Sequence, residues 1–343
     1  MKHIFLSFLF LFLTVALFSQ IGGEKTFAVL DFSTSSRTAA MGGELISVYD
    51  NDVNLIIANP SLLNRKMNGQ IAFTFVDFFS DINAVSVNYA TKSKKIGMLS
   101  FGIKALNYGN FTRIDETGLE LGEFTANEQQ FTTGISKVLN DKFTLGINLH
   151  FINSKLEQYS SFALLSNLGL GYYNDKNNIC VSVLAKNMGR QLKSYANDNE
   201  NLPFQLQMGV SKQLAHLPFR FSIVAHHLNK FDISNYYLDP TTTDPITGDE
   251  IENEDSVGKK VLRHFVLGGE LNPGRKSLFI RGGFNFQRRQ DLQVATRPAM
   301  VGFSWGLGFR ISKFHLNYSR VTYHLAGSIN TFSFTTNLTS FGL

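Results

Sequence analysis

The chain has 343 residues, a formal net charge of +5 at pH 7 and a single cysteine, Cys180. One thiol cannot form an intramolecular disulfide, so a small secreted domain held together by disulfides is excluded. The positive charges are spread along the chain, which disfavours a nucleic-acid partner. The mean hydropathy of −0.04 does not separate a soluble protein from a membrane barrel, because only alternate residues of a barrel strand face lipid.

The first 20 residues have the pattern of a secretory signal peptide. Lys2 and His3 form a short basic start, an apolar run occupies residues 4–18, and polar Ser19 and Gln20 follow. The apolar run is shorter than the roughly 20 residues that a membrane-spanning helix needs. We therefore predict an exported protein with a cleavable signal peptide at residues 1–20.

Residues 21–69 do not show the pattern of strands. Polar residues that can cap a helix come first, and the small residues Gly42 and Gly43 follow. Residues 53–63 are helical in character but are interrupted at Asn59-Pro60, where proline disfavours a helical residue before it. We predict that residues 21–69 form a partly helical hatch.

An acidic cluster in this segment resembles the beginning of a calcium loop. Asp50, Asp52 and Asn54 have the spacing of its first ligands. Leu55 stands where the loop needs glycine, and no glutamate stands at the closing position. We therefore interpret the carboxylates as part of the hatch and predict no metal ion and no cofactor there.

From Gln70 onward, apolar and polar residues alternate with a period of two. Such alternation predicts strands with one apolar and one polar face. Several runs reach about 10 to 13 residues, which suits a tilted bilayer crossing of about 9 to 11 residues better than an ordinary soluble strand of about 5 to 6. We predict 14 strands, with these approximate ranges: 70–79, 82–90, 95–106, 123–138, 142–154, 161–174, 178–187, 203–214, 218–229, 260–272, 276–288, 299–311, 313–323 and 328–338.

The connections between these runs alternate between short and long. The short ones contain the residues of tight turns, and the long ones include residues 107–122, 188–202 and 231–259. Outer-membrane barrels have short periplasmic turns and longer extracellular loops. The predicted fold class is therefore all-β: a 14-stranded antiparallel transmembrane outer-membrane β-barrel at residues 70–343, with the hatch as an N-terminal plug in its lumen.

Two long connections are candidate docking surfaces. The segment 239–255 is acidic and would need to project outward, because lipopolysaccharide would repel it unless cations bridge the two. A loop-bound calcium ion is the alternative to a cofactor-free protein. The second surface, at residues 107–122, offers aromatic side chains beside an arginine, which suit binding hot spots. The docking candidates are Tyr108, Phe111, Arg113, Asp249, Glu250, Glu252, Glu254 and Asp255.

The histidines do not have the spacing of metal ligands. His226 and His227 are neighbours in a predicted strand, so their side chains should point to opposite faces and cannot chelate together. His150, His264 and His315 each fall on a polar strand face, where we expect hydrogen-bonded side chains in the lumen. The sequence also lacks a nucleophile–base pair, paired catalytic carboxylates and a phosphate loop, and we predict that the protein is not an enzyme.

Three stretches of the hatch carry a family resemblance. They are residues 36–43 (SRTAAMGG), residues 48–52 (VYDND) and residues 59–63 (NPSLL). Together they resemble the hatch of FadL-like barrels, which are 14-stranded outer-membrane proteins with an N-terminal plug. Within that group the chain most resembles the PorQ family of the type IX secretion system of Bacteroidota, a PorV-related family, through residues 50–55, 108–111, 189–193, 202–207 and 216–220.

This resemblance implies a structural role in the attachment complex of that system. The barrel would anchor a PorZ-like surface protein, which works with the sortase PorU and with PorV to attach cargo to the cell surface. Outer-membrane lipid and lipopolysaccharide would surround it. The alternatives are a FadL-type transporter of hydrophobic small molecules and a cargo carrier like PorV. The polar residues on the predicted inner face disfavour a passage for hydrophobic molecules.

Overall fold

The computed structural model describes residues 26–195, 200–234, 256–273, 277–293, 300–324 and 327–342. The predicted signal peptide and the acidic segment with Asp249, Glu250, Glu252, Glu254 and Asp255 lie outside these residues. Within the described residues, no helix has the length and apolar character needed to cross a membrane.

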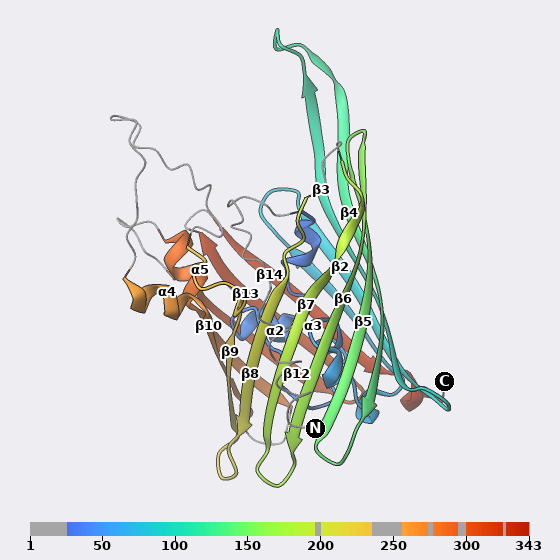
Figure 1. Cartoon of the computed structure of the whole chain (residues 1–343), viewed down its shortest axis with the longest axis vertical. Helices are drawn as coiled ribbons and strands as arrows, with labels where there is room; N and C mark the ends of the chain where they lie inside the picture. The colour runs from blue at the N-terminus through green and yellow to red at the C-terminus, as the bar shows by residue number, and fades with distance from the viewer. Residues whose placement is uncertain are drawn as a thin grey trace, which may run out of the picture.

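Fourteen antiparallel strands form a closed barrel (Figure 1), as the period of two predicts. Each strand pairs with its neighbours in sequence, and β1 closes the ring by pairing with β14 from Gln70 opposite Asn337 to Asp77 opposite Asn330. The strands are β1 (Gln70–Asp77), β2 (Asn83–Ser93), β3 (Gly97–Ile114), β4 (Glu120–Val138), β5 (Phe143–Leu156), β6 (Tyr159–Asn174), β7 (Ile179–Lys193), β8 (Gln205–Gln213), β9 (Phe219–Ala225), β10 (Phe265–Leu271), β11 (Leu278–Asn285), β12 (Phe303–Ile311), β13 (Phe314–His324) and β14 (Gly327–Asn337).

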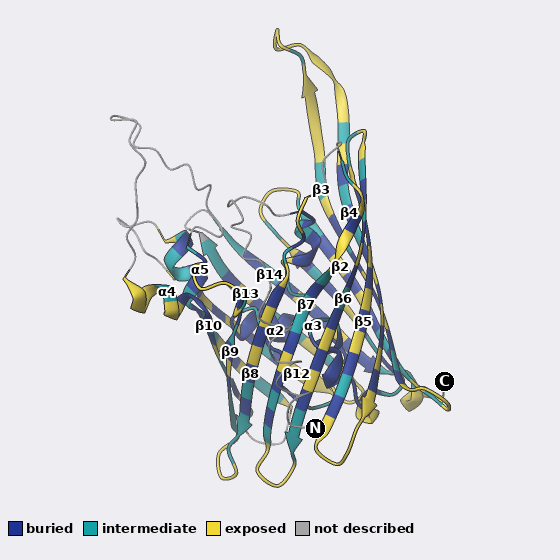
Figure 2. Ribbon diagram, viewed as in Figure 1, coloured by how far each residue is buried: buried dark blue, intermediate teal, exposed yellow. Residues whose placement is uncertain are grey.

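The alternation of side chains places polar and small residues inside the barrel and large apolar residues outside. In β5, Asn148 and His150 are buried. The residues that alternate with them, Leu149 and Phe151, are 49% and 41% exposed. The same alternation runs around the wall as stripes of buried and exposed residues (Figure 2). The apolar faces of the strands therefore point outward, which is the reverse of a soluble β-sandwich.

The core of the molecule lies inside the ring, where residues 26–69 contact the inward faces of the strands. We call these residues the inner segment. It comprises short helical turns: η1 (Ala28–Leu30), α2 (Ser36–Ala40), α3 (Leu55–Ala58), η2 (Pro60–Leu62) and η3 (Arg65–Met67). Its apolar side chains form clusters with inward residues of the wall; Val29 and Leu30, for example, pack with Ile152 and Leu165.

The barrel wall is uneven in height. β3 and β4 have 18 and 19 residues, whereas β9 and β10 have seven each. The β3–β4 hairpin rises well above the rest of the molecule (Figure 1). We call the end of the barrel with this hairpin the long-loop end, and the opposite end, where turns such as Ser312–Lys313 connect the strands, the short-turn end.

Four predicted boundaries are wrong. The predicted strand at residues 178–187 continues to Lys193 as β7, so the predicted loop at residues 188–202 begins six residues too early. The predicted loop at residues 107–122 is mostly strand, and its turn covers only residues 115–119. The predicted strand at residues 260–272 begins as helix α4 (Val257–Arg263), and the one at residues 276–288 ends in helix α5 (Phe286–Leu292). Both helices have a polar N-cap, because Ser256 accepts from the Lys259 N–H and Asn285 accepts from the Arg288 N–H.

Candidate functional site: the inner segment and the barrel ends

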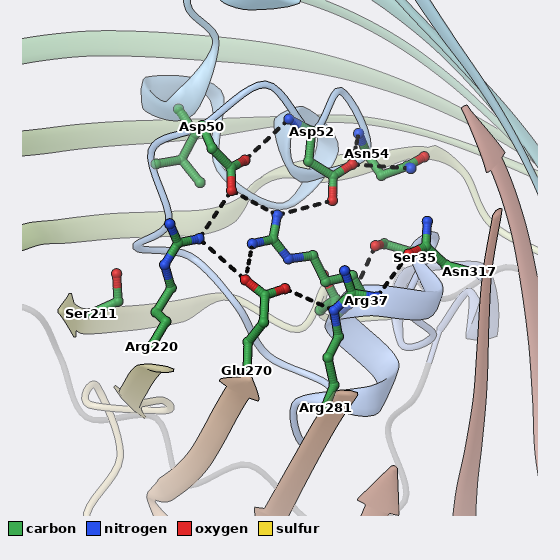
Figure 3. A network of polar contacts seen from close by, with 12 residues as sticks. Ser35, Arg37, Asp50, Asp52, Asn54, Ser211, Arg220, Glu270, Arg281 and Asn317 are labelled. Atoms are coloured by element: carbon green, nitrogen blue, oxygen red, sulfur yellow. Dashed lines mark hydrogen bonds and ion pairs between the residues drawn. The ribbon is translucent and has the colours of Figure 1, made fainter. Parts of the chain in front are cut away.

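An ion-pair network ties the inner segment to the barrel wall (Figure 3). Arg37 of α2 donates through Nη1 to Asp50 Oδ2 at 2.8 Å and through Nη2 to Glu270 Oε1 of β10 at 2.7 Å. A weaker contact joins Arg37 Nη1 to Asp52 Oδ2 at 3.4 Å. Arg37 therefore connects two parts of the inner segment with one strand of the wall.

Two further arginines from the wall complete the network. Arg220 of β9 donates to Asp50 Oδ2 at 3.0 Å, and its Nη1 lies 3.5 Å from Glu270 Oε1. Arg281 of β11 donates through Nε to Glu270 Oε2 at 2.8 Å. The three arginines balance the three carboxylates of Asp50, Asp52 and Glu270, so the buried charges compensate one another.

The charges of the network shift the titration of its members in the inner segment. Burial by itself would raise the pKa of Asp50, but Arg37 and Arg220 hold that pKa well below its ordinary value. Burial would lower the pKa of Arg37, yet Asp50, Glu270 and Asp52 raise it well above the ordinary value. Both groups are therefore charged at neutral pH, and the network acts as a fixed electrostatic attachment.

Glycines allow the inner segment and the wall to approach closely. Gly42 has a φ of +99°, and its N–H donates to Ser304 Oγ at 3.0 Å. A Cβ added to Gly283 of β11 would lie 2.1 Å from the Gly42 nitrogen, and one added to Gly146 of β5 would lie 2.2 Å from the Pro60 carbonyl carbon. These distances leave no room for a side chain, so backbone packs on backbone at both places.

The residues of the predicted hatch motif have distinct positions. Asn59 Oδ1 accepts from the Ser61 N–H at 3.0 Å, and Asn59 Nδ2 donates to the Ile46 carbonyl at 2.7 Å. Pro60 begins η2, a position that suits its fixed φ. Gly43 lies beside the Arg288 guanidinium. Asp50 and Asp52 belong to the ion-pair network and not to a ligand loop.

Two of the predicted docking residues face outward and one does not. Phe111 is exposed and stacks on Phe124 across the hairpin, with ring centroids 5.2 Å apart. Arg113 is exposed and pairs with Glu157 in the turn between β5 and β6. Tyr108 instead donates to Glu128 Oε1 at 3.0 Å and packs against the core inside the barrel. Tyr108 is therefore half-buried and its side chain supports the core rather than facing outward.

The histidine pair contradicts the expectation of opposite faces. His226 Nδ1 and His227 Nδ1 lie 2.6 Å apart. Strand β9 ends at Ala225, and His227 has a φ of +54°, so the alternation of strand side chains does not apply to these two residues. His264 is the C-cap of α4 and not a strand residue, and its Nδ1 lies 2.8 Å from the His226 carbonyl oxygen. Among the residues described, no three or more His, Cys, Asp or Glu side chains are grouped to hold a metal ion.

Each end of the barrel has a cavity beside the inner segment. The one at the short-turn end measures about 480 Å³, and the ion-pair network lines it. The one at the long-loop end is smaller, about 60 Å³, and is lined by residues that include Lys186, His226 and Arg288. Both linings are rich in charged and amide side chains, which disfavours a hydrophobic ligand at either place.

Comparison with known protein structures identifies the class of fold. No protein-family model matches the sequence, and no curated protein matches it. The monoaromatic hydrocarbon channel CymD is similar in structure, with a TM-score of 0.50 and 13% identity over 91% of this chain and 99% of the channel. A FadL homologue from Pseudomonas aeruginosa has a TM-score of 0.50 and 10% identity over 89% of this chain and 98% of that protein. The fold is therefore that of the FadL-like outer-membrane β-barrels.

Proposed function

We propose that this protein is a non-enzymatic barrel of the outer membrane, closed by its inner segment, which anchors a surface protein through its long-loop end. The observation that carries the proposal is the buried ion-pair network. Removing one member of such a network leaves an uncompensated buried charge, so the inner segment is held firmly in place. A barrel closed in this way works through its outer surface.

The outward face supports a position in a lipid bilayer. Phe101, Phe131 and Trp305 are 48%, 44% and 44% exposed, and many other large apolar side chains around the wall are similarly exposed. Soluble monomers rarely expose apolar patches of more than a few hundred Å². Several strands exceed the roughly 9 to 11 residues needed to cross a bilayer. Lipid is therefore the environment that this surface fits, and lipopolysaccharide would be its neighbour.

The upper β3–β4 hairpin (residues 108–125) supports the docking role. β2 pairs with β3 only as far as Asn107, and β5 pairs with β4 only from Ala126, with one further bond from the Glu157 N–H to the Thr125 carbonyl. Within the described residues, the outer edges of the upper hairpin above these points make no strand pairs. Unpaired edges are places where a partner can add a strand. The hairpin also exposes apolar side chains, among them Leu119 and Leu121, which are 63% and 55% exposed.

The charge of the hairpin indicates the chemistry of the partner. Within residues 108–125 there are four acidic residues, and the one arginine, Arg113, is paired with Glu157. An apolar patch with an acidic border fits a protein surface that is apolar with a basic border. Resemblance to the PorQ family implies that this partner is a PorZ-like surface protein, acting with PorU and PorV in one complex. The docking roles predicted for residues 249–255 stay predictions.

The experiment is deletion of the protein in its native organism, followed by complementation. The proposal predicts that the PorZ-like protein leaves the cell surface and that cargo remains unattached. Wild-type protein should restore both, and a variant lacking the tip at residues 115–119 should restore barrel assembly but not docking. The proposal is wrong if the surface protein stays attached in the deletion strain.

Transport of a hydrophobic small molecule is the second candidate. It is favoured by the shared fold with CymD, which is a monoaromatic hydrocarbon channel. The charged and amide side chains in the lining of both cavities count against it. In the same deletion strain, a lower rate of monoaromatic hydrocarbon uptake with unchanged surface attachment would establish transport in place of docking.

A further inference from the structure

The cavity at the long-loop end contains an arginine that forms no ion pair with any of the described residues. Arg288 lies in α5, lines this cavity and is 4% exposed. Its Nη2 donates to the Tyr323 hydroxyl at 3.3 Å, and the guanidinium lies 4.2 Å from the centroid of that ring. Arg288 Nε and Nη1 are buried and have no hydrogen-bond partner among the described residues. A buried charge without a counter-ion is strongly unfavourable, so the surroundings of Arg288 favour an anion.

Other polar groups on the same cavity also lack partners. Gln287 Nε2 and His226 Nε2 are buried without a hydrogen bond within the described part of the chain, and both residues line the cavity. Gln287 is 1% exposed and His226 is 3% exposed. An amide nitrogen can only donate, and an imidazole Nε2 donates in one of its tautomers. Arg288 and Gln287 of α5 and His226, which directly follows β9, therefore all offer hydrogen-bond donors to this cavity.

The remaining charged residues of the lining do not neutralise Arg288. Lys186 adds a second cation, and its nearest carboxylate is Glu44, at 3.9 Å. Asp31 also lines the cavity, but no ion pair joins it to Arg288 in the described residues. Gly43 allows the guanidinium to lie close to the backbone, because a Cβ there would be only 3.0 Å from Arg288 Nη2. The guanidinium therefore lies between the Gly43 backbone and the Tyr323 ring at the edge of the cavity.

We infer that this cavity binds an oxyanion, a phosphate or carboxylate group, with Arg288 as its counter-ion and Gln287 and His226 as further donors. Guanidinium groups match the geometry of phosphate and carboxylate oxygens. The cavity of about 60 Å³ has room for about four to six water molecules, or for one group of phosphate size. The oxyanion is either a free ion or a phosphate of lipopolysaccharide. This site is independent of the docking hairpin.

The test uses the purified full-length mature protein in detergent and two neighbouring arginines of α5. Arg288→Gln removes the cation of the cavity, whereas Arg289→Gln removes the same charge from a half-buried residue that does not line it. Inorganic phosphate is titrated by calorimetry, with acetate and chloride for comparison. We expect phosphate or acetate to bind the wild type and the Arg289→Gln variant, and to bind the Arg288→Gln variant at least tenfold more weakly.

Lipopolysaccharide in mixed micelles distinguishes the two sources. If it binds in an Arg288-dependent way and inorganic phosphate does not, the oxyanion comes from lipid; if phosphate itself binds, it is a free ion. If Arg288→Gln does not fold, Arg288→Lys replaces it, because this variant keeps the charge but loses guanidinium geometry and should bind several-fold more weakly. Equal binding by wild type and the Arg288 variants, or no binding of phosphate, acetate or lipopolysaccharide to wild type, overturns the inference.

Discussion

Arg37 and Glu270 are 233 residues apart in the chain, yet Arg37 Nη2 donates to Glu270 Oε1 at 2.7 Å inside the barrel. The side chains of Arg37 and Glu270 are 8% and 6% exposed. Glu270 also accepts from Arg281 and lies near Arg220, so one carboxylate serves three arginines. The pair thereby fixes α2 of the inner segment to β10.

Glu270→Gln should therefore weaken the attachment of the inner segment. The substitution keeps the size of the side chain but leaves excess positive charge in a buried place, and such losses cost about 3–5 kcal/mol. We expect the midpoint of thermal unfolding to fall and limited proteolysis within residues 26–69 to become faster. The matched control is Glu157→Gln, which breaks an exposed pair with Arg113 and should cost at most about 1 kcal/mol. Equal effects of the two variants would contradict the role of the network.

Acid should release the same attachment. The folded-state pKa of Asp50 lies below its ordinary value of 3.8, so the ionised carboxylate stabilises the folded state above that pH. This stability is lost as the pH falls below 3.8 toward the folded-state value. We expect ion conductance through the barrel in planar bilayers to rise in this acid range. Asp50→Asn should conduct more already at neutral pH and show a smaller acid-dependent rise, and an unchanged acid-dependent rise would count against Asp50.

Two neighbouring glycines of β11 provide a test of close packing. Gly283 faces inward, where a Cβ would lie 2.1 Å from the Gly42 nitrogen, whereas a Cβ on Gly282 would meet only the Ser304 carbonyl oxygen at 4.0 Å. Gly283→Ala should destabilise the protein by about 1–3 kcal/mol or more, because backbone cannot move aside easily. Gly282→Ala should be close to neutral. Chemical unfolding in detergent measures both, and similar free energies for the two variants would show that the inner segment is not packed on β11.

The histidine pair should make the long-loop end sensitive to mild acid. Burial, together with nearby positive groups, lowers the pKa of His226 to about 3 and that of His227 to about 2. Because both values lie below the ordinary 6.5, the stability contributed by the neutral rings is present above pH 6.5 and is lost as the pH falls below it. The thermal midpoint of the wild type should fall between pH 7.5 and 5. His227→Asn should show a smaller fall, and an identical fall would assign the pH dependence to other groups.

The barrel was predictable because alternation of side chains is a local property of the sequence. In β5, each residue's side of the wall follows from its position alone, and strict alternation sets both strand type and face. Elements whose ends depend on helix capping are harder to predict from the sequence. The predicted strand at residues 276–288 overlaps the start of α5, although Asn285 is a favourable N-cap and most residues after it are good helix formers.

The contacts of the candidate site could be predicted only in part. The sequence predicts Asp50 and Asp52 in the hatch, but nothing in their spacing connects them with Arg220 or Glu270, which come from distant strands. The sequence predicts a loop at residues 107–122, whereas Asn107 and Asn110 flank a bulge within the β3–β4 hairpin. The true turn is stabilised by Asp115, whose Oδ1 accepts from the Thr117 and Leu119 N–H groups.

The central claim, docking through the hairpin, is tested most directly by the amount of PorZ-like protein that co-purifies with the full-length chain from native membranes. The double variant Leu119→Ser/Leu121→Ser removes exposed apolar side chains of the hairpin, and Leu217→Ser removes one that is 60% exposed in the turn between β8 and β9 at the short-turn end. We predict at least a tenfold loss of the surface protein with the hairpin variant and none with Leu217→Ser. Equal recovery of the surface protein with both variants and the wild type would contradict docking through this hairpin.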